Sequence, residues 1–138
     1  MKKIPLIVGF CLLVSLSFMA CSKKSGGGGG GTVTEENLVI NVDPNPGSTT
    51  AQSLGATYDF RVVISSKVPS SGVKVDVVCT RDSDQAVVSS QTLNSSSSPI
   101  NASVTPLVSG VLCTVKVTVT SNSKPTNTAT LSFKVSRK

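Results

Sequence analysis

Residues 111–120 read VLCTVKVTVT, and this stretch decides the fold. Its apolar residues alternate with polar ones, and the apolar set is Val111, Cys113, Val115, Val117 and Val119. Successive side chains of a strand point to opposite faces, so the apolar set shares one face and the Thr and Lys residues share the other. This alternation predicts a strand with one buried side and one side in water.

Six further runs of the chain have the same character. They are rich in Val and Thr, they are separated by Pro, Gly, Asn and Ser, and they cover residues 38–42, 57–65, 73–80, 85–93, 100–107 and 126–135. Short runs at this spacing, with turn residues between them, predict an all-β sandwich or barrel. No long stretch shows the period of about 3.6 residues that marks an amphipathic helix. We therefore predict seven antiparallel strands in two sheets, packed face to face over residues 37–138.

This arrangement resembles an immunoglobulin-like or fibronectin-type-III-like sandwich in the number and spacing of its strands, and the resemblance covers residues 37–138. Antibody-type domains join their second and sixth strands by a disulfide, keep a core Trp and place Tyr two residues before the second Cys. Here the second run has no Cys, Trp is absent and that position is Val111. We therefore expect a bacterial variant of the sandwich and not an antibody-type domain.

The residues before the sandwich have a different character. Met1-Lys2-Lys3 precede an apolar stretch that ends at Ala20, and Cys21 follows it. A basic head, an apolar run and a small residue before the cleavage point describe a secretory signal. With Cys as the first mature residue, the segment resembles a bacterial lipoprotein signal, which implies cleavage before Cys21 and a lipid on its thiol. We expect a signal peptide over residues 1–20, and a lipidated Cys21 with a Gly-rich linker over residues 21–36.

Three alternatives to this interpretation stay open. The lipoprotein pattern has Leu at the third position before the Cys, where this chain has Phe18. A secretory cut after Ser17 is one alternative, and an ordinary thiol at Cys21 is another. The third is an uncleaved anchor, although the apolar stretch is at the short limit for a spanning helix. The glycines at 26–31 favour the lipoprotein, because Gly-rich chain behaves as a flexible tether.

The residues that follow Cys21 bear on location. Ser22 in place of Asp resembles the enteric-type signal for the outer membrane. In lipoproteins that are displayed on the cell surface an acidic run usually follows the Cys, and here Lys23 and Lys24 occupy those positions. We therefore expect a lipid anchor in the outer membrane, with the periplasmic side slightly favoured over the cell surface. Glu35 and Glu36 are expected to end the linker as a solvated pair.

Cys79 and Cys113 fall on the apolar faces of the third and sixth runs. An even pair of cysteines in an exported domain is typical of a structural disulfide. A bridge that closes a loop of about 34 residues would contribute roughly 3–4 kcal/mol in the chain-entropy model. The resemblance implies that the two strands are neighbours, so the bridge is expected within one sheet. A redox-active pair is the alternative, but the chain has neither the CxxC spacing nor a His.

Composition argues against several functions. His is absent, and His is the commonest general base and the usual partner of a Ser or Cys nucleophile, so no enzyme is expected. The formal net charge is +6, but the basic residues are scattered, which argues against nucleic acid as a partner. Few aromatic residues are present, which argues against a binder that stacks sugar rings.

No metal or cofactor is expected either. Asp82 and Asp84 share a turn, but two acids are too few for a calcium site and the loop lacks Gly. A glycosidase would need two acids held across a cleft. The best candidates are Asp59 and Asp76, and we expect them to balance the charges of Arg61 and Lys74 instead.

One coherent polar surface is predicted, on the runs 111–120 and 126–135. We name it the Thr/Lys face, and its residues are Thr114, Lys116, Thr118, Thr128, Thr130, Ser132 and Lys134. Such a flat, mildly basic face could bind an envelope protein or an anionic envelope polymer. Alternation alone also produces a solvent-facing side, and the loops at the strand ends are equally open candidates.

These observations together predict a function class. We expect a non-catalytic, membrane-anchored envelope lipoprotein that presents an immunoglobulin-like binding or scaffolding module. The membrane is its first partner, through the N-terminal lipid. The alternative is an accessory subunit of a membrane-bound enzyme or transport assembly.

Overall fold

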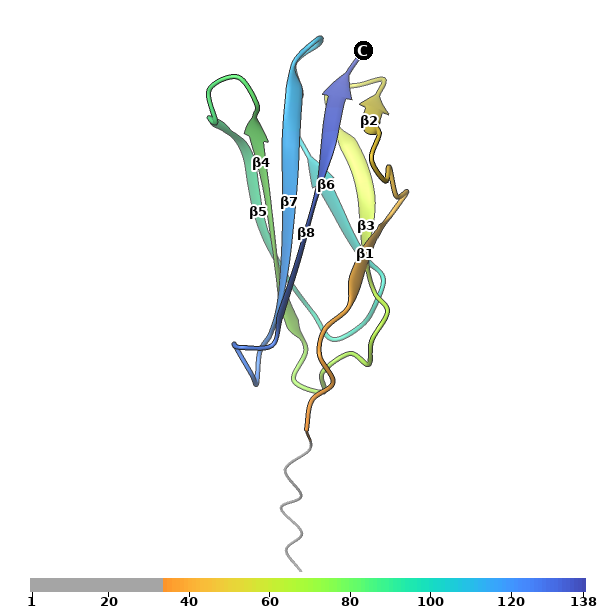
Figure 1. Cartoon of the computed structure of the whole chain (residues 1–138), viewed down its shortest axis with the longest axis vertical. Coiled ribbons are helices and arrows are strands. Elements are labelled where there is room, and N and C mark those ends of the chain that lie inside the picture. The colour runs from red at the N-terminus through yellow and green to blue at the C-terminus, as the bar shows by residue number, and fades with distance from the viewer. Residues whose placement is uncertain (1–33) are drawn as a thin grey trace, which may run out of the picture. The chain divides into compact units, whose positions relative to one another are not determined.

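The computed structural model describes residues 34–138, so the expected signal peptide and Cys21 lie outside the described residues. Eight strands form two sheets that face each other (Figure 1). The smaller sheet has the order β1 (Ile40–Asp43), β3 (Tyr58–Ile64) and β6 (Ile100–Val104). The larger sheet has the order β2 (Thr50–Ser53), β8 (Thr128–Arg137), β7 (Leu112–Ser121), β4 (Val73–Arg81) and β5 (Val87–Ser95). Across residues 34–138, no helix has the length and apolar character needed to cross a membrane.

The prediction of an all-β sandwich is confirmed, but the prediction of seven antiparallel strands is wrong in two respects. The additional strand is β2, and it pairs with the end of β8 in parallel. Its buried residues are Ala51 and Ser53, which are too small to produce a visible apolar alternation. The remaining strand pairs in both sheets are antiparallel, as predicted.

The core lies between the sheets and is built mainly from valine. In the larger sheet, Val77 on β4 lies opposite Val117 on β7, which lies opposite Leu131 on β8. The fully buried valines of this sheet are Val73, Val75, Val77, Val115, Val117, Val119 and Val135. Each such side chain stabilises the fold by roughly 1.5–3 kcal/mol relative to exposure, so these rows hold the larger sheet against the smaller one.

The aromatic rings join the two sheets. The rings of Phe60 on β3 and Phe133 on β8 meet edge to face, with centroids 5.3 Å apart. The ring of Tyr58 lies 6.1 Å from each of them, and partial burial raises the pKa of its hydroxyl. Edge-to-face pairs at this separation are favourable beyond the area that they bury. These rings therefore serve packing between the sheets.

Asn127 fixes the first described residues to the sandwich, at the end where β7 turns into β8. This buried side chain accepts a hydrogen bond from the Leu38 backbone N–H (2.9 Å) and donates to the Glu36 carbonyl (2.9 Å). It also donates to the Glu35 carboxylate (3.2 Å), which accepts further bonds from the hydroxyls of Ser121 and Ser123. Bonding to Ser123 is the main cause that lowers the pKa of Glu35. The expectation of a solvated pair is therefore wrong for Glu35.

The two ends of the described chain lie at opposite ends of the sandwich (Figure 1). Thr34 lines a depression together with Ser123 and Lys124, so it lies at the end that carries the β7–β8 turn, and the C-terminus lies at the other end. The Lys138 backbone N–H donates to the Ser53 carbonyl of β2 (3.0 Å), so the last residue is held to the sheet edge. We refer to the Lys138 end as the distal end.

Candidate functional site

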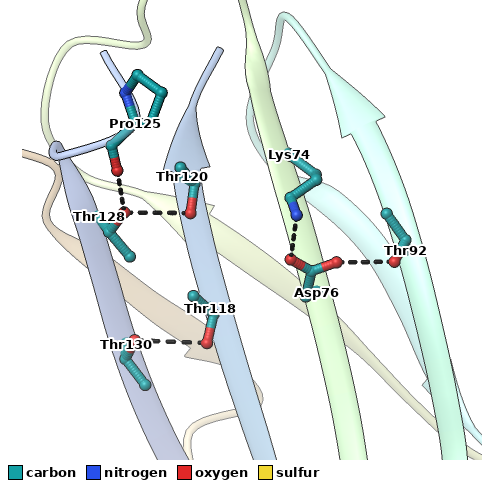
Figure 2. A network of polar contacts seen from close by, with 8 residues as sticks. All are labelled: Lys74, Asp76, Thr92, Thr118, Thr120, Pro125, Thr128 and Thr130. Atoms are coloured by element: carbon teal, nitrogen blue, oxygen red, sulfur yellow. Dashed lines mark hydrogen bonds and ion pairs between the residues drawn. The ribbon is translucent and has the colours of Figure 1, made fainter.

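The Thr/Lys face lies on the outer side of β7 and β8, as the alternation predicts. Thr118 lies opposite Thr130, and Lys116 lies opposite Ser132. The Thr130 hydroxyl donates to the Thr118 hydroxyl (3.4 Å), and the Thr128 hydroxyl bonds to Thr120 Oγ1 (3.2 Å), as Figure 2 shows. Cross-strand threonine pairs of this kind order the side chains of a sheet. The face therefore carries two cross-strand pairs of bonded hydroxyls.

An ion pair closes one end of this face. Lys134 Nζ lies 2.5 Å from the Asp82 carboxylate and 2.7 Å from Thr114 Oγ1. The Thr114 hydroxyl donates to the same carboxylate (2.6 Å). The Lys134 ammonium is the first cause, and the Thr114 hydroxyl the second, that hold the pKa of Asp82 below its usual range. The positive charge of Lys134 is thus matched by a negative charge within the face.

A second ion pair extends the polar surface onto β4 and β5 (Figure 2). Lys74 Nζ lies 2.9 Å from the Asp76 carboxylate, which also accepts a hydrogen bond from the Thr92 hydroxyl (2.7 Å). Lys74 is the main cause of the lowered pKa of Asp76. In the part of the chain that the structure describes, Lys116 is the cation of this surface that lacks an acidic partner. The surface is therefore less basic than expected, because Lys116 is the single lysine on it whose charge is not matched by an acid of the described chain.

The acids weighed for metal binding and catalysis do not converge. Asp84 pairs with Arg81 (2.9 Å) while Asp82 pairs with Lys134, so the two carboxylates serve different cations. No group of three metal-ligating side chains occurs among residues 34–138. Asp59 lies on β3 of the smaller sheet, whereas Asp76 lies on β4 of the larger one.

Of the two ion pairs predicted for these acids, the structure contains one and lacks the other. The expected balance of Asp76 by Lys74 is confirmed. The expected balance of Asp59 by Arg61 is wrong, because Arg61 pairs with Asp43. Strands β1 and β3 are antiparallel neighbours, and their register places Asp43 directly opposite Arg61. Opposite positions on adjacent strands bring side chains close, which favours the cross-strand pair.

Cys79 and Cys113 lie on β4 and β7, and the prediction that these strands are neighbours in one sheet is confirmed. Both thiols are buried and free in this structure, so the predicted disulfide is not formed in it. The register places Cys79 opposite Val115 and Cys113 opposite Arg81, so the cysteines are diagonal neighbours. Burial first, and the adjacent Cys113 second, raise the pKa of Cys79 to about 12. A thiol with so high a pKa is a poor nucleophile at neutral pH.

A feature that the sequence analysis missed is a group of exposed apolar side chains at the distal end. Val87, Val108 and Leu112 are 63%, 58% and 41% exposed, and we name them the distal apolar cluster. Val108 lines a shallow depression together with Leu112 and a second one together with Val87. Arg81 and Val111 line both depressions. Two of the three residues directly follow turn or loop segments, where the alternation of apolar and polar residues does not predict which side chains are exposed.

Comparison of the chain with protein-family models and with curated proteins gives no match in either case. The function is therefore inferred from the residues and their contacts. The described chain offers two surfaces for this purpose, namely the outer side of the larger sheet and the distal apolar cluster.

Proposed function

We propose that this protein is a non-catalytic lipoprotein of a bacterial envelope, anchored by lipid on Cys21, which presents an immunoglobulin-like sandwich for binding or scaffolding. The observation that carries the proposal is Cys21 itself, placed directly after a basic head and an apolar run. Several acyl chains hold a protein on a bilayer far more firmly than one. The glycines at 26–31 would give the sandwich freedom to move near the membrane.

The strand order supports the immunoglobulin-like part of the proposal. In that fold one sheet joins the first, second, fifth and fourth strands, and the other joins the third, sixth and seventh. We take β2 as a second half of the first strand and β5 as an addition beside the third. The orders β1-β3-β6 and β8-β7-β4 then match this pattern, except that the smaller sheet lacks the fourth strand. The cysteines depart from the antibody pattern, since β4 and β7 carry them and β3 does not.

The Thr/Lys face supports a protein partner better than an anionic polymer. Two of the three lysines on this side of the sheet are paired with Asp76 and Asp82. Attraction to a polyanion depends on a sustained excess of positive charge, which this surface lacks. Bonded hydroxyl pairs, with two of the three lysines neutralised, suit the polar contacts of a protein interface instead.

Lipid labelling of the full chain in a bacterial host tests the anchor. We expect incorporation of a clickable fatty acid and partition into the detergent phase for the parent chain and for Cys11→Ser. We expect Cys21→Ser to lose both, because its side chain lacks the thiol that accepts lipid. Equal labelling of the parent chain and Cys21→Ser would contradict the proposal.

Protease treatment of intact cells tests the location, with a tag after Lys138. The periplasmic side of the outer membrane predicts that the tag survives until the membrane is permeabilised. Loss of the tag on intact cells would place the sandwich on the cell surface and would contradict this part of the proposal.

We also propose that Cys79 and Cys113 become joined in the exported protein. Their strands are paired, and their thiols are near enough for Cys113 to raise the pKa of Cys79. Diagonal positions are farther apart than directly opposite ones, so the bridge requires the strands to adjust locally. Intact mass with and without reductant checks this, since the bridge removes two hydrogen atoms.

The distal apolar cluster favours a second function, that of an accessory subunit docked to a larger membrane assembly. Exposed apolar groups that adjoin one another mark interaction sites more often than isolated ones do. We expect Val108→Asp to abolish co-purification with such an assembly at fixed stoichiometry. Val39→Asp is the matched control, because Val39 is similarly exposed (55%) but lies outside the cluster. Equal co-purification of both variants would contradict this function.

A further inference from the structure

Strand β5 is an open edge of the larger sheet, and beyond the bulge at its start, from Ser89 to Ser95, it lacks the usual protection. Natural edge strands are kept short, or carry charges or proline, because an unpaired edge is a template for another strand. Edges β1 and β2 have four residues each, and β6 has five and lies between Pro99 and Pro106. Strand β5 has nine residues, VVSSQTLNS, without a charge or a proline.

The hydrogen-bond pattern shows which backbone groups of β5 face outward. The Asn122 N–H donates to the Gly72 carbonyl (3.1 Å) and the Asp82 N–H donates to the Leu112 carbonyl (3.0 Å). Even-numbered residues of β4 therefore bond to β7, and odd-numbered residues bond to β5 at positions 89, 91, 93 and 95. The backbone groups that point away from the sheet are those of Ser90, Thr92 and Asn94. None of these groups has a hydrogen-bond partner within residues 34–138.

We propose that β5 pairs antiparallel with β5 of a second copy of this chain, about a two-fold axis at Thr92. The regular part of the β4–β5 ladder runs from Ser89 to Ser95 and ends at the register shift beside Cys79, and Thr92 is its midpoint. The axis places Thr92 opposite Thr92 of the second copy. It also places Ser90 opposite Asn94 in two symmetric positions. Each of these three pairs exchanges two backbone hydrogen bonds.

A second copy fits this edge for two reasons. A two-fold contact uses the same patch on both copies, so an edge that meets itself must not repel itself. The side chains of Ser90, Thr92 and Asn94 are exposed and uncharged, and the nearest charges, Lys74 and Asp76, neutralise each other. A charged peptide would find no opposite charge to attract it at this edge, whereas a second copy of the chain would meet no like charge that repels it.

The pairing would continue the sheet from one copy into the other, which is the β-augmentation mode of recognition. Because the strands run antiparallel, the second copy is inverted along the strand direction. The two Thr34 residues then lie at opposite ends of the pair, so the two chains enter it from opposite sides. The inference concerns the sandwich itself and does not depend on lipid at Cys21.

The register is tested by charge substitution in the full-length chain purified in detergent. Ser90→Lys with Asn94→Lys places like charges opposite each other twice, and we expect sedimentation at the mass of one chain. Ser90→Lys with Asn94→Glu places opposite charges there, and we expect twice that mass, as for the parent. Circular dichroism checks that each variant is folded. A parent chain that stays monomeric at its highest soluble concentration would overturn the proposal, as would equal masses for the two double variants.

Cross-linking provides a second measurement that does not depend on those variants. Directly opposite residues of a hydrogen-bonded pair have Cα atoms about 5.5 Å apart, which is within the range of a disulfide. Under mild oxidation, we expect Thr92→Cys to yield a covalent dimer. Thr130→Cys is the matched control on the outer side of an interior strand, and the parent chain reports cross-linking through its native cysteines. A covalent dimer no more abundant in Thr92→Cys than in these two controls would also overturn the proposal.

Discussion

Asn127 is the residue whose loss should reveal most about how the first described residues are held. Its side chain is 5% exposed and makes three hydrogen bonds to a segment some ninety positions earlier in the chain. In Asn127→Ala the Leu38 N–H keeps its buried position but loses its acceptor. A buried donor without a partner costs about 1–3 kcal/mol, and the bond to the Glu36 carbonyl contributes about 1 kcal/mol more. We therefore expect a loss of about 3 kcal/mol in the free energy of unfolding.

Thermal and urea unfolding of the full chain, followed by circular dichroism, measure this change. For a domain of this size, about 3 kcal/mol corresponds to a fall in Tm of more than about 10 °C. Asn122→Ala is the control, since Asn122 is exposed in the same turn and its side chain donates only to the Ser71 carbonyl. We expect that control to change stability by no more than about 0.5 kcal/mol. If Asn127→Ala and Asn122→Ala unfold at the same temperature, the anchoring role assigned to Asn127 is wrong.

Three further predictions concern glycine, pH and oxidation. Gly72→Ala should destabilise the fold more than Gly110→Ala. Both glycines have a positive φ (+77° and +74°), which costs an alanine about 1–2 kcal/mol, but a Cβ at Gly72 would also lie 2.7 Å from a β5 carbonyl oxygen, whereas a Cβ at Gly110 would have no atom within 4 Å. Equal Tm values for the two variants would refute the steric argument. Because folding lowers the pKa of Glu35, its ionised carboxylate stabilises the fold above the unfolded-state pKa of about 4.3, and this stabilisation is lost as the pH falls through the lower folded value. The difference in unfolding free energy between the parent and Glu35→Gln should therefore become smaller in acid. A difference that does not change with pH would contradict this. Oxidation of Cys79 and Cys113 should raise the free energy of unfolding by roughly 3–4 kcal/mol, and an unchanged urea midpoint upon reduction would count against the bridge.

The alternation of residues 111–120 was sufficient to predict β7 and its faces, because a strand has a strict period of two. Lys74 and Asp76 were predictable as partners for the same reason, since positions two apart in a strand share a face. Strand β2 was not predictable in this way. Its buried side chains are small, and its place is decided by parallel pairing with β8, a partner far away in the sequence.

The contacts that shape the candidate sites depend on such distant pairings. Asp82 and Lys134 are fifty-two positions apart and meet only because the larger sheet brings the turn after β4 close to β8. Asn127 looks like an ordinary turn residue in the sequence, since Asn is common in turns. Its role follows from the path of residues 35–38 over that turn. The sequence signal for a turn was correct, but it carried no information about what crosses it.

The opposite placement of Thr34 and Lys138 has a mechanical consequence. If the chain is anchored before Thr34 and a load is applied at the distal end, tension runs along the strands. Such tension slides β1 against β3 and β8 against β7, so that several ladder bonds must break together. Peeling a strand from a sheet edge breaks those bonds one after another and needs less force. Because forced unfolding follows the unfolding rate, we expect single-molecule pulling between these two ends to need higher forces than pulling across the sheet. If the chain is anchored to a membrane before Thr34, the sandwich would then resist best a force directed along its long axis, from the membrane to a partner bound at the distal end.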